Sequence, residues 1–120
     1  MADRVLFIGW GTPVRGREER GLEVFTEALG ILGRRQQEGQ IEKFDVLLLK
    51  PNTVLNGCIS VEGTVEQIDA LQEDEEFRRN TVEANLVVDG LCHLEGFANE
   101  GVSEAMEMYR GAAAKVPQTA

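Results

Sequence analysis

The chain has few of the residues that build metal centres and disulfide frameworks. Its 120 residues include one histidine, His93, and two cysteines, Cys58 and Cys92. A single histidine excludes a metal site made of several histidines. Both cysteines lie within apolar runs, where a free thiol behaves as a small hydrophobic side chain. We therefore expect neither a disulfide nor a metal centre.

Long apolar segments are also absent. No stretch approaches the ~20 apolar residues that a helix needs to cross a bilayer. The first residues, Met1-Ala2-Asp3-Arg4, lead straight into a strand-like run without the basic and apolar segments of a signal peptide. From these two features we predict a cytoplasmic protein that has no membrane partner.

Positive charge is scarce in the second half of the chain. The formal net charge is −9, and residues 62–107 carry 13 acidic side chains against 2 basic ones. An acidic surface repels the phosphate backbone of nucleic acids. We therefore expect no nucleic-acid partner, and we interpret the acidic surface as a solvated helix face.

What the chain does contain is a regular change of hydrophobic period. Strand-like runs occupy Arg4–Trp10, Lys43–Lys50, Gly57–Glu62 and Leu91–Phe97, and helical patterns cover Arg17–Gln37, Val65–Leu86 and Val102–Lys115. The first run is apolar on both alternating faces, which is typical of a central strand. Only about six residues separate the second and third runs, too few for a parallel crossover, so these runs form an antiparallel hairpin.

This β-α-β-β-α-β order predicts an α+β fold of the ferredoxin-like type. Such a fold has a four-stranded antiparallel sheet with its helices on one face. Right-handed crossovers place the first and third strands at the centre of the sheet. We expect a single domain with its core at about residues 4–98 and an extra C-terminal helix at about residues 102–115.

The second helical pattern carries its own start and break signals. Thr64 and Gln67 have the spacing of a capping box. The acidic run that follows Leu71 predicts a break or jog near Glu73–Asp74. Beyond it, the predicted apolar stripe continues through Phe77, Val82 and Leu86.

The second face of the predicted sheet is also apolar. The first, second and fourth strand-like runs carry apolar residues at both odd- and even-numbered positions, so both faces of the sheet are apolar. Exposing so large an apolar patch is unusual for a monomer. Two sheets packed face to face across a two-fold axis would bury it. We therefore predict a homodimer.

These patterns resemble the dimeric α+β barrel superfamily, which includes small antibiotic-biosynthesis-type monooxygenases and muconolactone isomerases. The resemblance rests on the element order over Arg4–Phe97, on the hairpin Phe44–Glu62, and on the stretch Asp74–Asp89. It implies that two sheets close into a barrel whose interior is a candidate ligand pocket. It carries no catalytic residue over to this chain.

Strand alternation selects the candidate site residues. On the last strand His93, Glu95 and Phe97 share one face, and the smaller even-numbered residues share the other. The smaller set suits contact with helices, so we predict that His93 and Glu95 point into the space between the sheets. By the same reasoning Cys58 and Ser60 face that space, whereas their odd-numbered neighbours face the helices.

The chemistry of these side chains defines their predicted roles. Burial and a charged neighbour tune histidine for acid/base work near neutral pH, so His93 and Glu95 are the candidate catalytic residues. The candidate ligand-binding residues are Trp10, Cys58, Ser60 and Phe97. The competing interpretation is a polar network at the dimer interface, with Trp10 packed against the partner.

Three functions are compatible with this sequence. The first is a dimeric module that binds a small apolar or aromatic molecule between its sheets. The second is a cofactor-independent monooxygenase or isomerase that uses His93 as an acid/base. The third is a structural or partner-binding dimer with no ligand pocket. We expect no cofactor, because Val14 occupies the third glycine position of the only dinucleotide-like run, Gly9–Val14.

Overall fold

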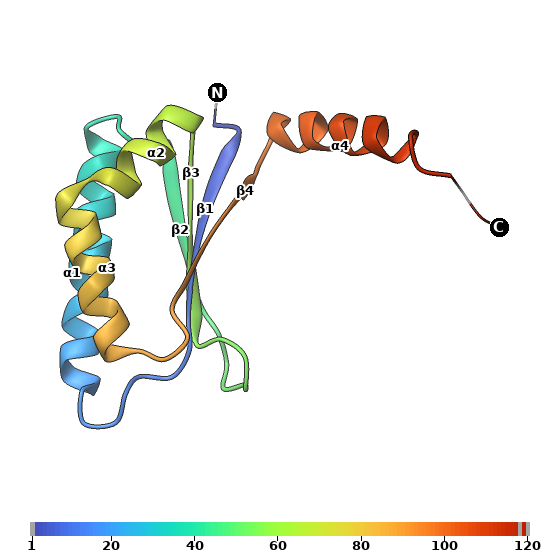
Figure 1. Ribbon diagram of the computed structural model, residues 1–120. Coiled ribbons are helices and arrows are strands. Elements are labelled where there is room, and N and C mark those ends of the chain that lie inside the picture. Colours follow the sequence, from blue (N-terminus) through green and yellow to red (C-terminus); the bar gives the residue numbers. More distant parts are fainter. Residues whose placement is uncertain (1, 118, 120) are drawn as a thin grey trace.

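The computed structural model describes residues 2–117 and residue 119, and its elements follow the predicted order (Figure 1). The elements are β1 (Arg4–Trp10), α1 (Glu18–Gln37), β2 (Lys43–Leu48), β3 (Gly57–Gly63), α2 (Val65–Glu73), α3 (Glu75–Val87), β4 (Cys92–Phe97) and α4 (Glu100–Ala113). Each strand lies within one or two residues of its predicted bounds.

The four strands form one antiparallel sheet in the order β2-β3-β1-β4. The predicted α+β class, the β2–β3 hairpin and the central positions of β1 and β3 are therefore confirmed. The register aligns Ile8 with Ile59 on one side and with His93 on the other. Cross-strand partners project to the same face of a sheet, so this alignment assigns every strand side chain to a face.

Helices α1, α2 and α3 cover one face of the sheet (Figure 1). Leu6, Ile8, Ile59 and Val61 project from the central strands into this layer and are almost fully buried. They form the main hydrophobic core with residues of the three helices and the loop after α1, namely Ile31, Leu32, Ile41, Ile68, Leu71 and Phe77. Burial of side chains of this size contributes about 1.5–3 kcal/mol each, so this layer holds the domain together.

The predicted break between α2 and α3 is confirmed at Asp74. The Thr64–Gln67 capping box begins α2, and Asp74 caps α3 by accepting a hydrogen bond of 2.9 Å from the Phe77 backbone N–H. Arg35 of α1 lies 3.2 Å from the same carboxylate. Burial alone would raise the pKa of Asp74, but the Phe77 N–H and the Arg35 guanidinium outweigh it and lower the pKa below its ordinary value.

The break also changes which face of α3 is buried. The predicted stripe through Val82 and Leu86 is wrong, because both side chains are exposed. The new helix begins at Glu75 with its own rotation, and it buries Phe77, Asn80 and Val87 instead. A hydrophobic pattern cannot be extended in phase across a helix break.

None of the helices in the described part of the chain covers the other face of the sheet (Figure 1). Val5 and Phe7 of β1 project from it beside Cys58, Ser60 and Leu94, and Leu94 is 58% exposed. We call this side the open face. Among the described residues, no helix is long and apolar enough to cross a membrane.

Asp74 offers a test of the junction between the helices. Asp74→Ala removes the α3 cap and one partner of Arg35, so we expect it to lower the free energy of unfolding by about 2 kcal/mol. Glu73→Ala, at the exposed neighbouring position, is the control and should change it by less than about 0.5 kcal/mol. Urea denaturation measures both values. Equal effects of the two substitutions would contradict the role given to Asp74.

Candidate functional site

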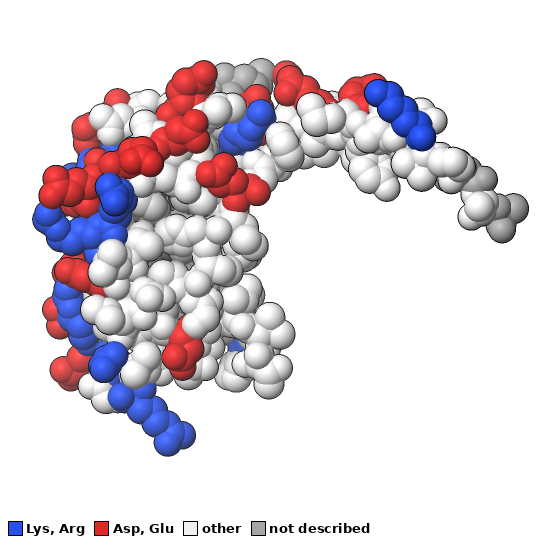
Figure 2. Space-filling view, in the orientation of Figure 1, with Lys and Arg blue, Asp and Glu red and all other residues white. Residues whose placement is uncertain are grey.

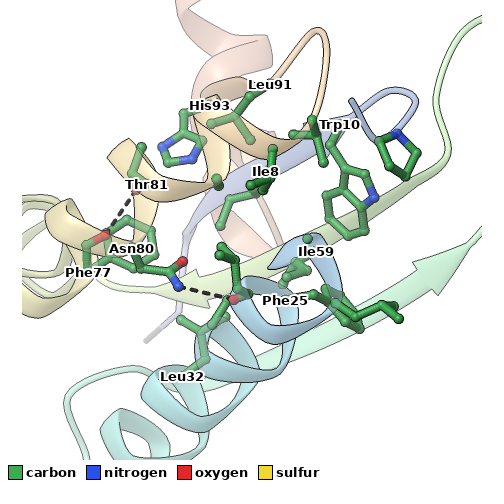
Figure 3. Close-up of a pocket in the computed structure, with 18 of the residues that line it drawn as sticks. Ile8, Trp10, Phe25, Leu32, Ile59, Phe77, Asn80, Thr81, Leu91 and His93 are labelled. Carbon is green, nitrogen blue, oxygen red and sulfur yellow. Dashed lines mark hydrogen bonds between the residues drawn. The ribbon is translucent and has the colours of Figure 1, made fainter. Parts of the chain in front are cut away.

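A cavity of about 330 Å³ lies between the sheet and helices α1 and α3 (Figure 3). Its lining is mostly apolar and comes from the sheet (Ile8, Trp10, Leu48, Ile59, His93), from α1 (Glu18, Gly21, Leu22, Val24, Phe25, Ala28, Leu32), from α3 (Phe77, Asn80, Thr81, Ala84, Val87) and from adjoining loops (Pro13, Val88, Leu91). Ligand pockets in proteins have volumes of roughly 300–1,000 Å³ and this kind of lining. The cavity is therefore large enough for a small ligand.

Few polar groups interrupt this apolar lining, and two of them are available to a ligand. Asn80 is only 8% exposed, and its Nδ2 donates a hydrogen bond of 3.1 Å to the backbone carbonyl of Val24. Its Oδ1 accepts no hydrogen bond from the described residues. The Thr81 hydroxyl, by contrast, is used within α3, where it donates to the Phe77 carbonyl at 3.0 Å.

His93 is the second available polar group. The register places it beside Ile8 on the helix side of β4, and its ring lies 5.8 Å from that of Phe77. It makes no hydrogen bond to the described residues, so both ring nitrogens can meet a ligand. Burial lowers the pKa of His93 below its ordinary value, because the apolar surroundings disfavour the imidazolium. At neutral pH the ring is therefore neutral, with one nitrogen as donor and the other as acceptor.

Trp10 lines the end of the cavity near the β1–α1 loop. Its ring lies 5.5 Å from that of Phe25, tilted by 56°. It also lies over Gly57 of the neighbouring strand, where an added Cβ would stand 2.7 Å from the indole. Glycine at position 57 thus leaves the space that the indole occupies next to β3, beside the cavity.

The structure brings together two of the six predicted site residues, His93 and Trp10. Glu95 and Phe97 share the helix side of β4 with His93 but lie outside the cavity, where Glu95 accepts a hydrogen bond from Gln72 and Phe97 lies under the guanidinium of Arg4. Cys58 and Ser60 lie on the open face, as predicted.

The prediction that His93 and Glu95 point away from the helices is wrong. It ranked the two faces of β4 by the size and polarity of their side chains. The register decides the matter instead, because His93 is the cross-strand partner of Ile8, which is buried under the helices. The smaller residues of β4, Cys92 and Leu94, consequently project from the open face. The buried residues of β1, through their cross-strand partners, indicate which residues of β4 face the helices.

The sequence reasoning missed Asn80 and Thr81. Both lie on the buried side of α3, among residues that the faulty apolar stripe did not include. The signal was an asparagine one helical turn beyond Phe77, because a polar residue on a helix's buried face needs a partner or a ligand. In the part of the chain that the structure describes, no three His, Cys, Asp or Glu side chains gather as a metal site would require.

Known structures share this fold. No protein-family model and no curated protein matches the chain. A dimeric protein of unknown function and ferredoxin-like fold from Bacteroides fragilis aligns with 13% identity and a TM-score of 0.59 over 79% of this chain and 96% of that one. A Pseudomonas aeruginosa protein aligns with 11% identity and a TM-score of 0.61 over 82% and 96% of the two chains.

A third similar structure is that of an enzyme. SnoaB, a cofactor-independent oxygenase from Streptomyces nogalater, aligns with 15% identity and a TM-score of 0.50 over 82% of this chain and 93% of that one. At these identities the likeness establishes the fold alone. The predicted resemblance to ferredoxin-like dimeric and monooxygenase-type proteins is confirmed at that level.

The lowered pKa of His93 predicts a pH effect on stability. Between the folded-state pKa and the unfolded value of about 6.5, the unfolded chain binds a proton that the folded chain does not. Stability therefore rises with pH across this window and falls as acid is added. We expect His93→Gln to flatten this slope, which for one group is at most about 1.4 kcal/mol per pH unit. Urea denaturation from pH 4.5 to 7.5 measures it, and parallel curves for wild type and variant would contradict the burial of His93.

Proposed function

We propose that the protein binds a small apolar or aromatic molecule in the cavity between α1, α3 and the sheet. The observation that carries this proposal is an apolar cavity of about 330 Å³ in which two polar side chains, His93 and Asn80, have unused hydrogen-bonding groups. A filled core would leave neither the volume nor the unpaired polar atoms. The sequence predicted a pocket between two sheets, and the proposal moves the ligand to the helix side of one sheet.

The polar groups restrict the ligand's chemistry. The Asn80 Oδ1 accepts a hydrogen bond, and a neutral His93 ring offers one donor and one acceptor. A planar aromatic molecule with one or two hydroxyl or carbonyl groups would satisfy both side chains while its rings contact Phe25, Phe77 and Trp10. An anionic ligand would lose its hydration in this lining without an opposite charge to compensate, because the charged side chain named in the lining, Glu18, is itself acidic.

Filling the cavity tests the proposal. We expect 2-naphthol, as a bicyclic probe with one hydroxyl, to bind the wild-type chain in isothermal titration calorimetry. Ala84→Leu places extra methyl groups in the lining and should weaken binding at least tenfold. Ala70→Leu, the same change at an exposed position of α2 outside the cavity, is the matched control and should bind as the wild type does. Equal affinity in both variants would place the probe elsewhere.

A second candidate function is catalysis in the same cavity without a cofactor, as a monooxygenase or isomerase that uses His93 as the acid/base. It is favoured by the position of His93, which faces the cavity, makes no internal hydrogen bond and has a lowered pKa. A neutral imidazole is the form that can take a proton from an aromatic hydroxyl. The fold shared with SnoaB is compatible with this candidate. Glu95 lies outside the cavity and has no role in it.

Oxygen uptake distinguishes the two candidates. If the chain is an oxygenase, a hydroxylated polycyclic compound such as 1,8-dihydroxyanthrone should consume oxygen faster with the protein than without it. His93→Gln should then lower the rate at least a hundredfold, the usual contribution of a positioned base, while 2-naphthol still binds. No uptake above the protein-free rate would contradict the oxygenase, and an unchanged rate in the variant would remove His93 from the chemistry.

We also propose a homodimer in which two open faces pack against each other. Leu47 of β2 and Leu94 of β4 are 60% and 58% exposed on this face, and none of the helices that the structure describes covers them. The Bacteroides fragilis protein of the same fold is dimeric.

The third sequence-based hypothesis, a purely structural dimer without a pocket, is less well supported because a ligand-sized cavity is present within one chain. The predicted cytoplasmic location stays a prediction.

A further inference from the structure

The C-terminal helix α4 leaves the body of the molecule as an arm (Figure 1). We use this term for Glu100–Ala113. The radius of gyration is 17.0 Å, whereas a compact chain of this length has about 14 Å. The accessible surface is 8173 Å², roughly 1,700 Å² more than a compact monomer of this mass exposes. The chain therefore presents surface that a monomer of its size normally buries.

The arm is amphipathic. Its apolar side borders the hollow, the concave space between the arm and the body of the molecule (Figure 2). Val102, Met106 and Tyr109 follow one another at helical spacing and are 47%, 45% and 70% exposed. In Figure 2 the charged side chains of the arm lie on its outer side, and the surface that borders the hollow below it is largely uncharged. An isolated helix of this length is marginal in water, so this apolar side needs a surface to pack against.

The root of the arm is fixed to the body. An added Cβ at Gly101 would stand 2.2 Å from the carbonyl oxygen of Asp3, so only glycine permits this approach. The Asn99 side chain donates to the Ala2 carbonyl at 2.6 Å and to Glu62 Oε1 at 2.8 Å. The Ala98 N–H donates to the Asp3 carbonyl at 3.1 Å.

These contacts give the arm a set direction. Asn99 itself adopts a left-handed φ of 52°, which a side chain rarely takes unless its surroundings hold it there. Figure 1 shows the arm running away from the sheet on the side of the open face.

We propose that the arm packs on a second copy of this chain. In a two-fold pair each arm crosses to its partner, and its apolar side covers the partner's exposed leucines on edge strand β2 and in the loop after it. Two of these, Leu47 and Leu49, are 60% and 43% exposed. An edge strand with apolar side chains is a surface that proteins normally cover. This inference rests on the proposed homodimer and adds the element that holds the two chains together.

The available area agrees with a second copy as the occupant. The excess surface of roughly 1,700 Å² per chain is about twice the ~800 Å² that each partner buries in a standard stable interface. One chain supplies both halves of the interface, an apolar arm and an apolar sheet with its edge, as a self-complementary two-fold contact requires. A membrane is disfavoured, because α4 carries three glutamates and one arginine, whereas interfacial helices are rich in basic residues.

Two methionines of the arm provide a matched test. Met106 lies on the apolar side, and Met108, 79% exposed, lies on the opposite side of the helix. We expect the wild-type chain to sediment as a dimer at micromolar concentration. Met106→Glu should raise the dissociation constant of the dimer at least tenfold, and Met108→Glu should change it less than twofold.

Hydrogen exchange of the arm is the second measurement. Amides of residues 103–112 should be protected at concentrations where the wild-type chain is a dimer, and should lose that protection on dilution and in Met106→Glu. Both methionine variants should bind 2-naphthol as the wild type does, because the arm lies outside the cavity.

The outcomes separate the proposals. A wild-type monomer would overturn both the homodimer and the packing of the arm on the partner, without bearing on the ligand cavity. A dimer that Met106→Glu leaves intact, or whose arm amides stay unprotected, would overturn only the packing of the arm on the partner. Protection of the arm in a wild-type monomer would mean that the arm folds back on its own sheet, which also contradicts the proposal.

Discussion

The antiparallel register of β1 with its two neighbours is the constraint on which the rest of this structure depends. It aligns Ile8 with Ile59 and His93, and the three helices cover the face on which these residues lie. One residue of slip would turn every side chain of a strand to the opposite face. The same register that builds the core therefore decides which polar side chains enter it and which apolar ones stay outside.

The cavity is a consequence of that arrangement. Helix α3 starts anew at Asp74, and its rotation turns Asn80 and Thr81 toward the sheet. The sheet turns His93 toward α3 from the other side, and Trp10 lies at one end above Gly57. A polar pair with unused hydrogen-bonding groups in an apolar space costs stability unless water or a ligand satisfies it. The proposed binding role accounts for that cost.

The open face and the arm both present apolar surface that no other described part of the chain covers. Three helices cover one side of the sheet, and the other side exposes apolar side chains such as Leu47 and Leu94. With the open face and α4 uncovered, the accessible surface of 8173 Å² is more than a compact monomer of this mass exposes. Glu62, an open-face residue of β3, accepts the hydrogen bond from Asn99 that helps to fix the arm. The two unpaired surfaces are therefore linked through the root of the arm.

Most of the fold could be predicted from the sequence, because periodicity, the short β2–β3 connection and the Thr64 and Asp74 signals act over short distances. The faces of β4 could not be read in this way. Its more apolar set, with Cys92 and Leu94, lies on the open face, so hydrophobicity indicates the wrong face. Only pairing with β1, about 85 residues earlier in the sequence, identifies the right one. Asn80 was missed for a related reason, since the phase of α3 depends on the geometry of the break. The candidate site thus depended on long-range geometry, whereas the fold did not.

The decisive measurement is an NMR titration of the ¹⁵N-labelled chain with 2-naphthol. If the ligand binds between the helices and the sheet, the indole N–H of Trp10 and the side-chain amide of Asn80 should shift with a common affinity, while the backbone amides of Phe7, Ser60 and Leu94 stay unchanged. Shifts confined to Phe7, Ser60 and Leu94 would place the ligand on the open face and contradict the proposed site.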